Sequence, residues 1–345
     1  MGAIYKMGVI GSGMMAHRRC KALLETNRVE LVGVASKTKK NAEALAEKYN
    51  CRFSTIDYRE LLSAQPDFLL VELPHSIQSE VVRWAIGEEL HLLIGSCIAF
   101  SEDELHEIKR ASTEKNLIIE GGFEARYKEV WKRSKQFIQS GDLGQITAIQ
   151  SIACWSANVD SWYYSQKQSG GMPVTHMTYA FLNPLSWIFG PPLSVHAIAN
   201  RIGEKKEGMV NEVSCVASLV YDNNIICSML ASYVNQTDAP TWKVVVLGTK
   251  GCLEIFPSEF GAGSLVLYRM NEIPLKVNFD GAPDAFLLQS EAFIDGLDGT
   301  VNGLQNSVIA GEGDVSTAAA IVKSIIEEKK ITINQTNVFS YESES

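Results

Sequence analysis

The stretch Tyr5-Lys6-Met7-Gly8-Val9-Ile10-Gly11-Ser12-Gly13-Met14-Met15-Ala16 decides the fold of this chain of 345 residues. Its first half reads as an apolar strand, and its second half has the spacing Gly-x-Gly-x-x-Ala before a helix. Gly11 permits a tight turn, Gly13 lets the backbone approach a pyrophosphate, and Ala16 lets the helix pack closely on the strand. The amide groups and dipole of the helix N-terminus would face the phosphates. The stretch predicts a dinucleotide-binding turn; an ordinary structural glycine turn is the alternative.

The residues that follow a second strand, at 30–35, bear on which dinucleotide binds. In NAD sites an Asp or Glu near this place bonds the ribose 2′-hydroxyl. This chain has Ser36, Lys37 and Thr38 instead, whose hydroxyls and single cation suit a 2′-phosphate. We therefore expect NADP(H) to be preferred, with NAD(H) as a second possibility. The alternative is that Ser36 caps the next helix and that Lys37 is solvated.

The composition is that of an ordinary globular protein, with 46% hydrophobic and 21% charged residues. The length suggests two domains. A formal charge of −9 argues against nucleic acid as a partner, because such binding needs a basic face. The chain enters its first strand without a charged and apolar leader, and no apolar run has membrane-spanning length. We therefore expect a cytoplasmic protein without membrane contact.

The cysteines and histidines predict neither a disulfide framework nor a metal site. The seven cysteines are scattered and form no Cys-x-x-Cys pair, which favours reduced core residues. The six histidines lack the His-x-x-x-His and His-Glu-x-x-His spacings that bind zinc. We expect no resident metal ion.

Strands and helices alternate as far as residue 120, and this pattern predicts a parallel sheet with helices on both faces. The expected strands after the second are 68–71, 91–94 and 117–120, and the expected helices are 41–49, 58–63, 79–87 and 102–115. Ligands bind beyond the carboxyl ends of such strands. The loops 73–78, 95–100 and 120–127 are therefore the ones expected at a site.

After residue 146 long strand-like runs dominate, joined by turns such as Asp222-Asn223-Asn224. Successive strands of this kind predict a mostly antiparallel sheet. The expected strands are 146–157, 193–201, 212–221, 225–234, 242–247 and 252–256, and the expected helices are 176–189, 284–297 and 315–329. We expect an α/β Rossmann domain at residues 1–124 and a C-terminal α+β domain for substrate and oligomerisation at residues 125–345.

Several motifs, in this order, resemble the glucose-fructose oxidoreductase, inositol dehydrogenase and MocA family (GFO/IDH/MocA). They are the glycine turn, Leu73-Pro74, Gly141-Asp142-Leu143-Gly144-Gln145-Ile146, Ser169-Gly170-Gly171 and Trp187-Ile188-Phe189-Gly190. The resemblance covers nearly the whole chain. It implies nicotinamide chemistry in a cleft between a Rossmann domain and a domain whose open-faced sheet often serves in oligomerisation. We expect the cofactor to contact Gly11, Ser12, Gly13, Met14, Met15, Ser36, Lys37, Thr38, Leu73, Pro74, His75, Gln78 and Ser96.

The resemblance breaks at the positions that carry the family's proton chemistry. The family's Glu-Lys-Pro triplet aligns with Gly95-Ser96-Cys97, so its lysine is absent. Without gaps, the family's catalytic Asp and His align with His176 and Ala180, and a further common Asp aligns with Asn183. A positioned acid or base is worth about 10²- to 10⁴-fold in rate. We therefore do not expect sugar dehydrogenation by the family's usual mechanism.

Three residues are the catalytic candidates: His176, Ser96 and Tyr164. His176 has an unperturbed pKa of about 6.5, which suits proton transfer, although a histidine bonded to nearby backbone is the alternative. Ser96 can bond a cofactor amide. Tyr164 lies on the loop that contacts cofactor and substrate in the family, although packing is the alternative for its ring. Cys97 can be a small core residue, or a reactive thiol if it has a cationic neighbour.

Family members that lack the lysine and the Asp/His pair are of two kinds. Some, such as biliverdin reductases, reduce a conjugated or imine-like acceptor, and the loop from Ser161-Trp162-Tyr163-Tyr164 to Gly190 resembles these. Others, like the galactose-regulon repressor of yeasts, bind the dinucleotide without catalysis. We expect an NADPH-dependent reductase of a small or conjugated organic acceptor. The alternatives are a non-catalytic regulatory or sensor protein and an assembly subunit.

The C-terminal strands also predict self-association. Val213, Cys215, Ala217, Leu219 and Tyr221 share one face of their strand, and the run at 242–247 is apolar on both faces. A sheet that is covered by helices on one side leaves an apolar patch on the other. We therefore expect a homo-oligomer formed through this sheet.

Overall fold

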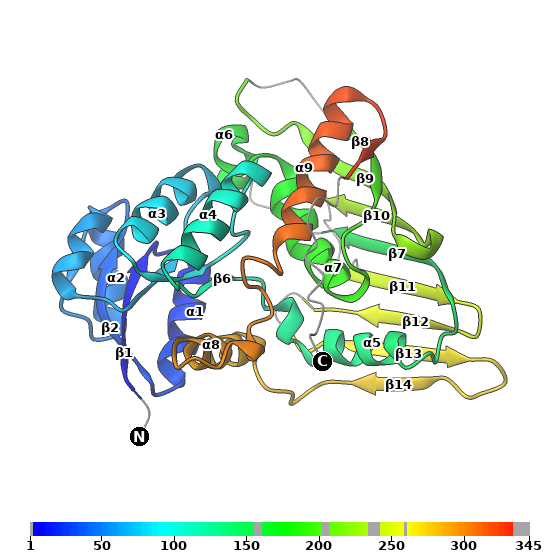
Figure 1. Cartoon of the computed structure of the whole chain (residues 1–345), viewed down its shortest axis with the longest axis horizontal. Coiled ribbons are helices and arrows are strands. Elements are labelled where there is room, and N and C mark those ends of the chain that lie inside the picture. Colours follow the sequence, from blue (N-terminus) through cyan, green and yellow to red (C-terminus); the bar gives the residue numbers. More distant parts are fainter. Residues whose placement is uncertain (1–2, 155–160, 202–206, 234–241, 259–260, 334–345) are drawn as a thin grey trace.

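The computed structural model describes residues 3–154, 161–201, 207–233, 242–258 and 261–333. The side chains of residues 175, 176 and 201 also lie outside the described part. The chain forms two sheets, and Figure 1 shows the first at left and the second at right. Helices α7 (Asn183–Phe189) and α9 (Glu312–Glu327) lie between them in that view.

The first sheet has six parallel strands in the order β3-β2-β1-β4-β5-β6. Their bounds are β1 Tyr5–Ile10, β2 Val29–Ala35, β3 Ser54–Thr55, β4 Phe68–Val71, β5 His91–Ile94 and β6 Ile119–Gly121. Strands β1 and β4 are neighbours, but β1 leads to β2 on one side and β4 leads to β5 on the other. A switch point therefore lies between them, and dinucleotides bind across such points at the carboxyl ends of the strands.

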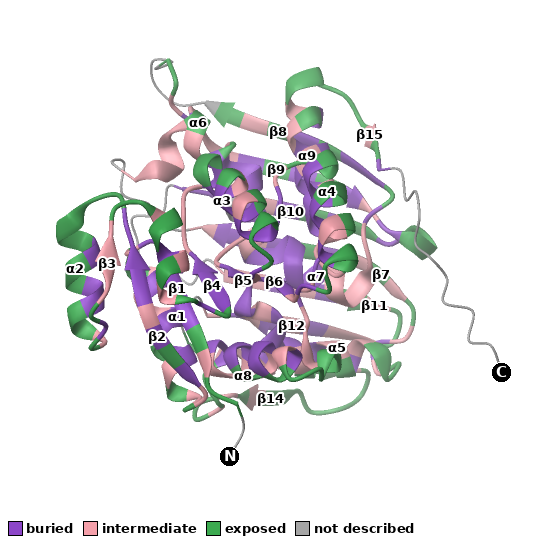
Figure 2. Cartoon of the chain, turned by 60° about the vertical axis from the view of Figure 1, so that its left-hand side comes forward, coloured by how far each residue is buried: buried purple, intermediate pink, exposed green. Residues whose placement is uncertain are grey.

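Helices cover both faces of this sheet, because its strands are apolar on both. One face packs against η1 (Tyr58–Ala64), α3 (His75–Gly87) and α4 (Glu102–Glu114). The other packs against α1 (Met14–Glu25), α2 (Lys39–Lys48) and α8 (Ala285–Leu297). Figure 2 shows β1, β4 and β5 buried between these layers, while the outer turns of α2 and α3 are exposed.

The second sheet has nine strands in the order β14-β13-β12-β11-β7-β10-β9-β8-β15. Their bounds are β7 Ile146–Cys154, β8 Ser194–Arg201, β9 Glu212–Val220, β10 Ile226–Ser232, β11 Trp242–Gly248, β12 Gly251–Phe256, β13 Ser264–Arg269, β14 Leu275–Asn278 and β15 Ile331–Thr332. The pairing of β7 with β10 is parallel, and the other pairings are antiparallel. One face packs against α5 (Glu129–Gln139), the π-helix η4 (Pro173–Leu182) and α9.

The predicted fold class is confirmed: a Rossmann-like parallel sheet is followed by a large, mostly antiparallel sheet. The hairpin turn is also confirmed, since Asn223 and Asn224 have positive φ between β9 and β10. The prediction of α3 was wrong by one turn. We expected it to begin at residue 79, and it begins at His75, directly after Pro74, because its polar first turn hides the helical periodicity. Strands β3, β13, β14 and β15 were not predicted.

One helix crosses the expected domain boundary. Helix α8 follows strand β14 of the second sheet in sequence, yet it packs against α1, and its Phe293 ring meets Phe68 of β4 edge to face at 5.2 Å. The division at residue 124 stays a prediction, but the last third of the chain clearly helps to build the first domain's core. Among the described helices, none is both long and apolar enough to cross a membrane.

Candidate functional site

The turn after β1 has the geometry that a pyrophosphate needs. Gly11 has a φ of +113°, and its amide donates to the Ala35 carbonyl at 2.9 Å. A side chain at Gly11 would overlap the backbone of Glu72, so only glycine fits there. A Cβ at Gly13 would meet no atom within 4 Å, and Gly13 caps α1 without a side chain. The backbone at the start of α1, including Met14 and Met15, is therefore open to an anionic ligand.

The residues after β2 form a hydroxyl pair beside this turn. The Oγ atoms of Ser12 and Ser36 are 2.6 Å apart, and Ser36 is buried, while Lys37 is exposed. The cap of α2 is Thr38, whose Oγ1 accepts the Asn41 amide at 3.4 Å. The alternative that Ser36 caps this helix was therefore wrong. Thr38 has a structural duty that was not foreseen, and its part in binding a 2′-phosphate stays a prediction.

Gln78 fixes the loop after β5, where the family's triplet aligns. The Ser96 hydroxyl donates to Oε1 of Gln78 at 3.1 Å, and Nε2 of Gln78 donates to the Cys97 carbonyl at 2.7 Å. Two predicted residues, Ser96 and Gln78, are thus brought together. Burial raises the pKa of the Cys97 thiol well above its usual range, which favours the interpretation of Cys97 as a core residue.

His75 lies in the contact between the two domains. Its ring stacks on Phe100 at 4.1 Å, meets Trp162 at 5.1 Å, and has Nδ1 2.9 Å from the Ser169 carbonyl. Burial lowers the pKa of His75 to about 4, so the ring is neutral at physiological pH. These contacts are those of a packing residue. Leu73 packs against the core of the first sheet, and Pro74 caps α3; cofactor contacts from His75, Leu73 and Pro74 stay predictions.

The helix that should carry the family's Asp and His is a π-helix, η4. A π-helix bonds residue i to i+5, so it places one more residue in each turn than an α-helix. Ala180 is buried in the core of the second sheet. Its neighbour Tyr179 instead donates its hydroxyl to Oε1 of Glu124 at 3.3 Å. The side chain of His176 lies outside the described residues, so its catalytic role stays a prediction.

Tyr179 leads to a charged cluster that the sequence did not reveal. Glu124, three residues after the end of β6, also contacts Lys128 at 3.2 Å and Arg19 of α1 at 3.8 Å. Arg19 in turn contacts Glu72, directly after β4, at 2.7 Å. These residues come from four separate segments at the carboxyl ends of β4 and β6. No local spacing could have predicted the cluster; a charged residue on the inner face of α1 was its one signal.

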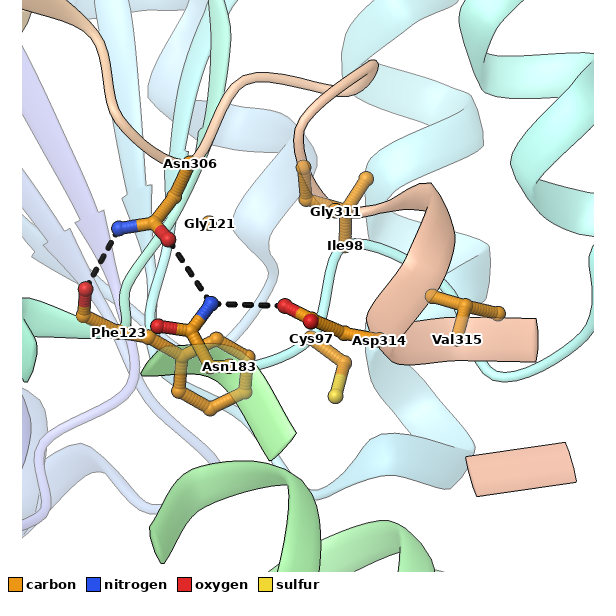
Figure 3. A pocket seen from close by; sticks show the side chains of 9 residues that line it. All are labelled: Cys97, Ile98, Gly121, Phe123, Asn183, Asn306, Gly311, Asp314 and Val315. Carbon is orange, nitrogen blue, oxygen red and sulfur yellow. Dashed lines mark hydrogen bonds between the residues drawn. The ribbon is translucent and has the colours of Figure 1, made fainter. Parts of the chain in front are cut away.

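A second buried cluster joins the domains (Figure 3). Asn183 donates through Nδ2 to Oδ2 of Asp314 at 2.7 Å and to Oδ1 of Asn306 at 2.9 Å. Arg126 lies 3.1 Å from Asp314, and all four side chains are buried. Asn183, Asn306 and Asp314 border a cavity of about 10 Å³, which is close to the space of one water molecule. Asp314 of α9 therefore supplies a carboxylate beside Asn183, the residue expected to align with a family Asp.

Tyr164 packs away from these clusters. Its ring lies 5.2 Å from that of Tyr233 against the core of the second sheet, and its carbonyl accepts the Val210 amide at 2.7 Å. Burial raises the pKa of its hydroxyl. These contacts favour the packing alternative for Tyr164.

Two family models match the chain over consecutive regions. The Rossmann-fold model, described as an oxidoreductase family with an NAD-binding Rossmann fold, matches residues 5–123. The GFO/IDH/MocA C-terminal domain matches residues 131–254. The chain therefore belongs to the GFO/IDH/MocA family and is an NAD(P)-dependent oxidoreductase.

Similar proteins cover different shares of the chain. An uncharacterized oxidoreductase of Synechocystis is 23% identical over 72% of this chain and 70% of that protein. Glucose-6-phosphate 3-dehydrogenase of Bacillus subtilis is 30% identical, but over only 42% of this chain and 41% of that enzyme. Levoglucosan dehydrogenase, solved with NADH and levoglucosan, superposes with a TM-score of 0.84 over 96% of this chain and 100% of that chain. At 15% identity this last likeness shows the fold alone.

Proposed function

We propose that this protein uses NADP(H) to reduce a small or conjugated organic acceptor. The proposed cofactor preference rests on the residues that follow β2. The Ser12 and Ser36 hydroxyls lie 2.6 Å apart beside the open turn, Lys37 is exposed next to them, and no carboxylate follows the strand. A 2′-phosphate would accept from the hydroxyls and face the lysine, whereas a carboxylate would repel it.

Cofactor preference is tested by calorimetry with NADPH and NADH on the full chain. We expect NADPH to bind at least about tenfold more tightly, because one charge-assisted contact is worth about 1.5 to 3 kcal/mol. Lys37→Asp should reverse the order. The matched control is Lys39→Asp on the exposed start of α2, which should leave the order unchanged. Equal affinities of the wild-type protein for both dinucleotides would contradict the preference.

The bound nicotinamide supplies the hydride, so the protein must supply a proton to the acceptor. The usual positions cannot do so, because Ser96 is bonded to Gln78 and Ala180 faces the core. Two candidates remain on η4: His176, from its chemistry, and Tyr179, whose hydroxyl is held by Glu124 with Lys128 beside it.

Proton delivery is tested by single-turnover oxidation of NADPH in His176→Ala and Tyr179→Phe. The variant that removes the donor should lose about 10²-fold or more in rate while its affinity for NADPH barely changes. If His176 is the donor, the wild-type rate should also show a step near the histidine pKa. An acceptor activated by its own conjugation would leave both variants active, and this result would remove both residues from the mechanism.

A second candidate is the oxidation of a sugar hydroxyl. Sugar chemistry is favoured by three similar proteins whose names describe redox enzymes of sugars. They are glucose-6-phosphate 3-dehydrogenase, D-glucoside 3-dehydrogenase and a dTDP-sugar 3-reductase. Aldoses, glucosides and hexose phosphates should therefore be assayed with NADP⁺ and NAD⁺. Turnover of these sugars, without reduction of carbonyl or conjugated acceptors, would favour this second function over the first.

A further inference from the structure

Glu72 places a carboxylate at the switch point of the first sheet. It directly follows β4, and its amide donates to the Ile10 carbonyl of β1 at 2.8 Å. A Cβ added to Gly95, directly after β5, would overlap the Glu72 carboxylate. The carboxylate therefore rests on the backbone of Gly95 and fills the space that a side chain would take there. Any residue larger than glycine at position 95 would displace the Glu72 carboxylate.

Arg19 forms an ion pair with this carboxylate. Its Nε lies 2.7 Å from Oε1 of Glu72, and its other nitrogens donate to Oε1 of Gln289 at 2.6 Å and to the Gly122 carbonyl. Arg19 is 2% exposed, whereas Glu72 is 11% exposed. The guanidinium is thus fully enclosed, and the part of the pair that reaches solvent is the side chain of Glu72, at the carboxyl end of β4.

A buried ion pair is weak support for stability, because both charges lose their hydration. Burial accordingly raises the pKa of Glu72, and Arg19 opposes this effect. A carboxylate has about four acceptor positions, and Arg19 uses only part of them. The pair is also neutral as a whole, so it does not repel a pyrophosphate bound at the neighbouring glycine turn.

The expected path of a dinucleotide along the carboxyl ends of the strands indicates which ligand groups Glu72 can contact. In a bound dinucleotide the adenosine half would lie toward β2, and the pyrophosphate would lie at the start of α1. The nicotinamide nucleoside half would then be expected beside the ends of β4 and β5. Its donors are the two ribose hydroxyls and the carboxamide amide group, and a fixed carboxylate is a suitable acceptor for each of them.

We propose that the Glu72 carboxylate, positioned by Arg19, accepts hydrogen bonds from the nicotinamide nucleoside half of the bound dinucleotide. This proposal rests on the dinucleotide function above and names a binding residue that the sequence motifs do not include. A purely structural ion pair is the competing explanation, and the two differ in what they do to ligands that lack the nicotinamide half.

The experiment measures dissociation constants of NADPH, NADH and 2′,5′-ADP, which lacks the nicotinamide nucleoside, for full-length wild type and Glu72→Ala. We expect the constants for both dinucleotides to rise about tenfold or more, as loss of one charge-assisted bond predicts. The constant for 2′,5′-ADP should stay within about twofold of wild type by the same reasoning. Glu80→Gln, in an exposed ion pair with Arg59, is the control and should change none of the constants.

A rescue variant separates the carboxylate from its position in the sequence. In Glu72→Ala combined with Gly95→Asp, the new side chain starts where the Glu72 carboxylate now lies, so dinucleotide affinity should recover. If Glu72→Ala does not fold, Glu72→Gln keeps the shape without the charge and should weaken the dinucleotides selectively.

Three results would overturn the proposal: unchanged dinucleotide affinity in a folded variant, equal loss for 2′,5′-ADP, or a folded rescue variant that stays weak. Failure of dinucleotide binding, on which the proposal rests, looks different, because the wild-type protein would then bind none of the three ligands.

Discussion

At the scale of single residues, two carboxylates lie beside positions that carry none of their own. The resemblance to the family aligns Gly95 and Asn183 with its usual acidic residues. In space, Glu72 fills the site beside Gly95, and Asp314 bonds Asn183 at 2.7 Å. An alignment compares positions along the chain, whereas chemistry depends on positions in space. The loss of family residues is therefore a poorer guide to lost chemistry than the sequence suggested.

Sequence alone could predict the residues whose duties are local. Gly11 was predictable because a positive φ and a close backbone contact both require glycine. Arg19 and Glu72 were not, because the contact between them depends on how α1 packs against β4. Tyr179 was also missed, because nothing in its local pattern shows that the helix is a π-helix.

Glu120 gives a prediction about pH. It is fully buried in the middle of β6 and accepts a hydrogen bond from the Tyr127 hydroxyl. Burial raises its pKa from 4.5 to about 7. Because the folded pKa is the higher one, its contribution to stability is complete below pH 4.5 and is lost as pH rises through about 7. The shift corresponds to about 3 kcal/mol in the free energy of unfolding.

The test is urea unfolding at pH 5 and pH 8 for wild type and Glu120→Gln. Glutamine keeps an acceptor for Tyr127 but does not titrate. The wild type should therefore lose about 2 to 3 kcal/mol more than the variant between the two pH values. Other buried acids titrate equally in both proteins and cancel in the difference. Parallel changes in wild type and variant would show that Glu120 does not titrate in this range.

At the scale of elements, periodicity predicted the central strands and most helices. Strands β4 and β5 are continuous apolar runs, and β9 and β10 alternate around an Asn turn. Strand β14 was missed because it is a short edge strand with mostly exposed residues, and it carries no alternating pattern. The sequence thus missed an element that is held in place by pairing with a neighbouring strand and not by a pattern in its own residues.

The contact between α7 and α9 gives a prediction at this scale. Asn183 starts α7 and binds Asp314 in the first turn of α9, with Arg126 beside them. Asn183→Asp would place two carboxylates in a buried site with one guanidinium. We expect about 2 to 4 kcal/mol of destabilisation at pH 8, from an unpaired buried charge. At pH 5 the loss should be smaller, because one carboxyl can then hold a proton.

Its control is the exchange Asn183→Asp with Asp314→Asn, which restores one carboxylate and one amide beside Arg126. Thermal unfolding should show that the exchange recovers most of the lost stability. If the double variant is as unstable as the sum of the single ones, the carboxylate must come from α9 in particular, and the two positions are not interchangeable.

At the scale of the whole molecule, the two domains contact each other through segments that are distant in the sequence. Helix α8 completes the core of the first sheet, and Gln289 of that helix binds both Arg19 and the Gly121 carbonyl. The loop 305–314 reaches β6 through Asn306, Gly121 and Ser307. The candidate site is therefore built from both ends of the chain. The sequence predicted two separate units. It did not predict that α8 packs on the first sheet, because an amphipathic helix does not reveal which surface it covers.

The second sheet has one face that the described helices do not cover. Cys215, Ala217 and Leu219 face α9 and its neighbours, while the alternate residues of the same strands point the other way. Ile198 and Ile226 are 64% and 58% exposed on that outer face, and Val216 pairs with Ile198 across β8 and β9. Leu247 and Tyr268 extend the apolar surface toward β13. A sheet face that exposes several large apolar side chains suits a second copy of the chain.

We expect the protein to be a homo-oligomer that associates through this outer face. Ile198→Lys combined with Ile226→Lys should shift it to a monomer in light scattering at micromolar concentration, because each buried lysine would lose its hydration without a partner. The matched control is Ile56→Lys, which is equally exposed, at 67%, but lies on the first domain and should not change the molar mass. Cofactor affinity should be the same in all three proteins, since the face lies away from the glycine turn. A wild-type monomer, or a double variant with the wild-type mass, would rule out this face as the interface.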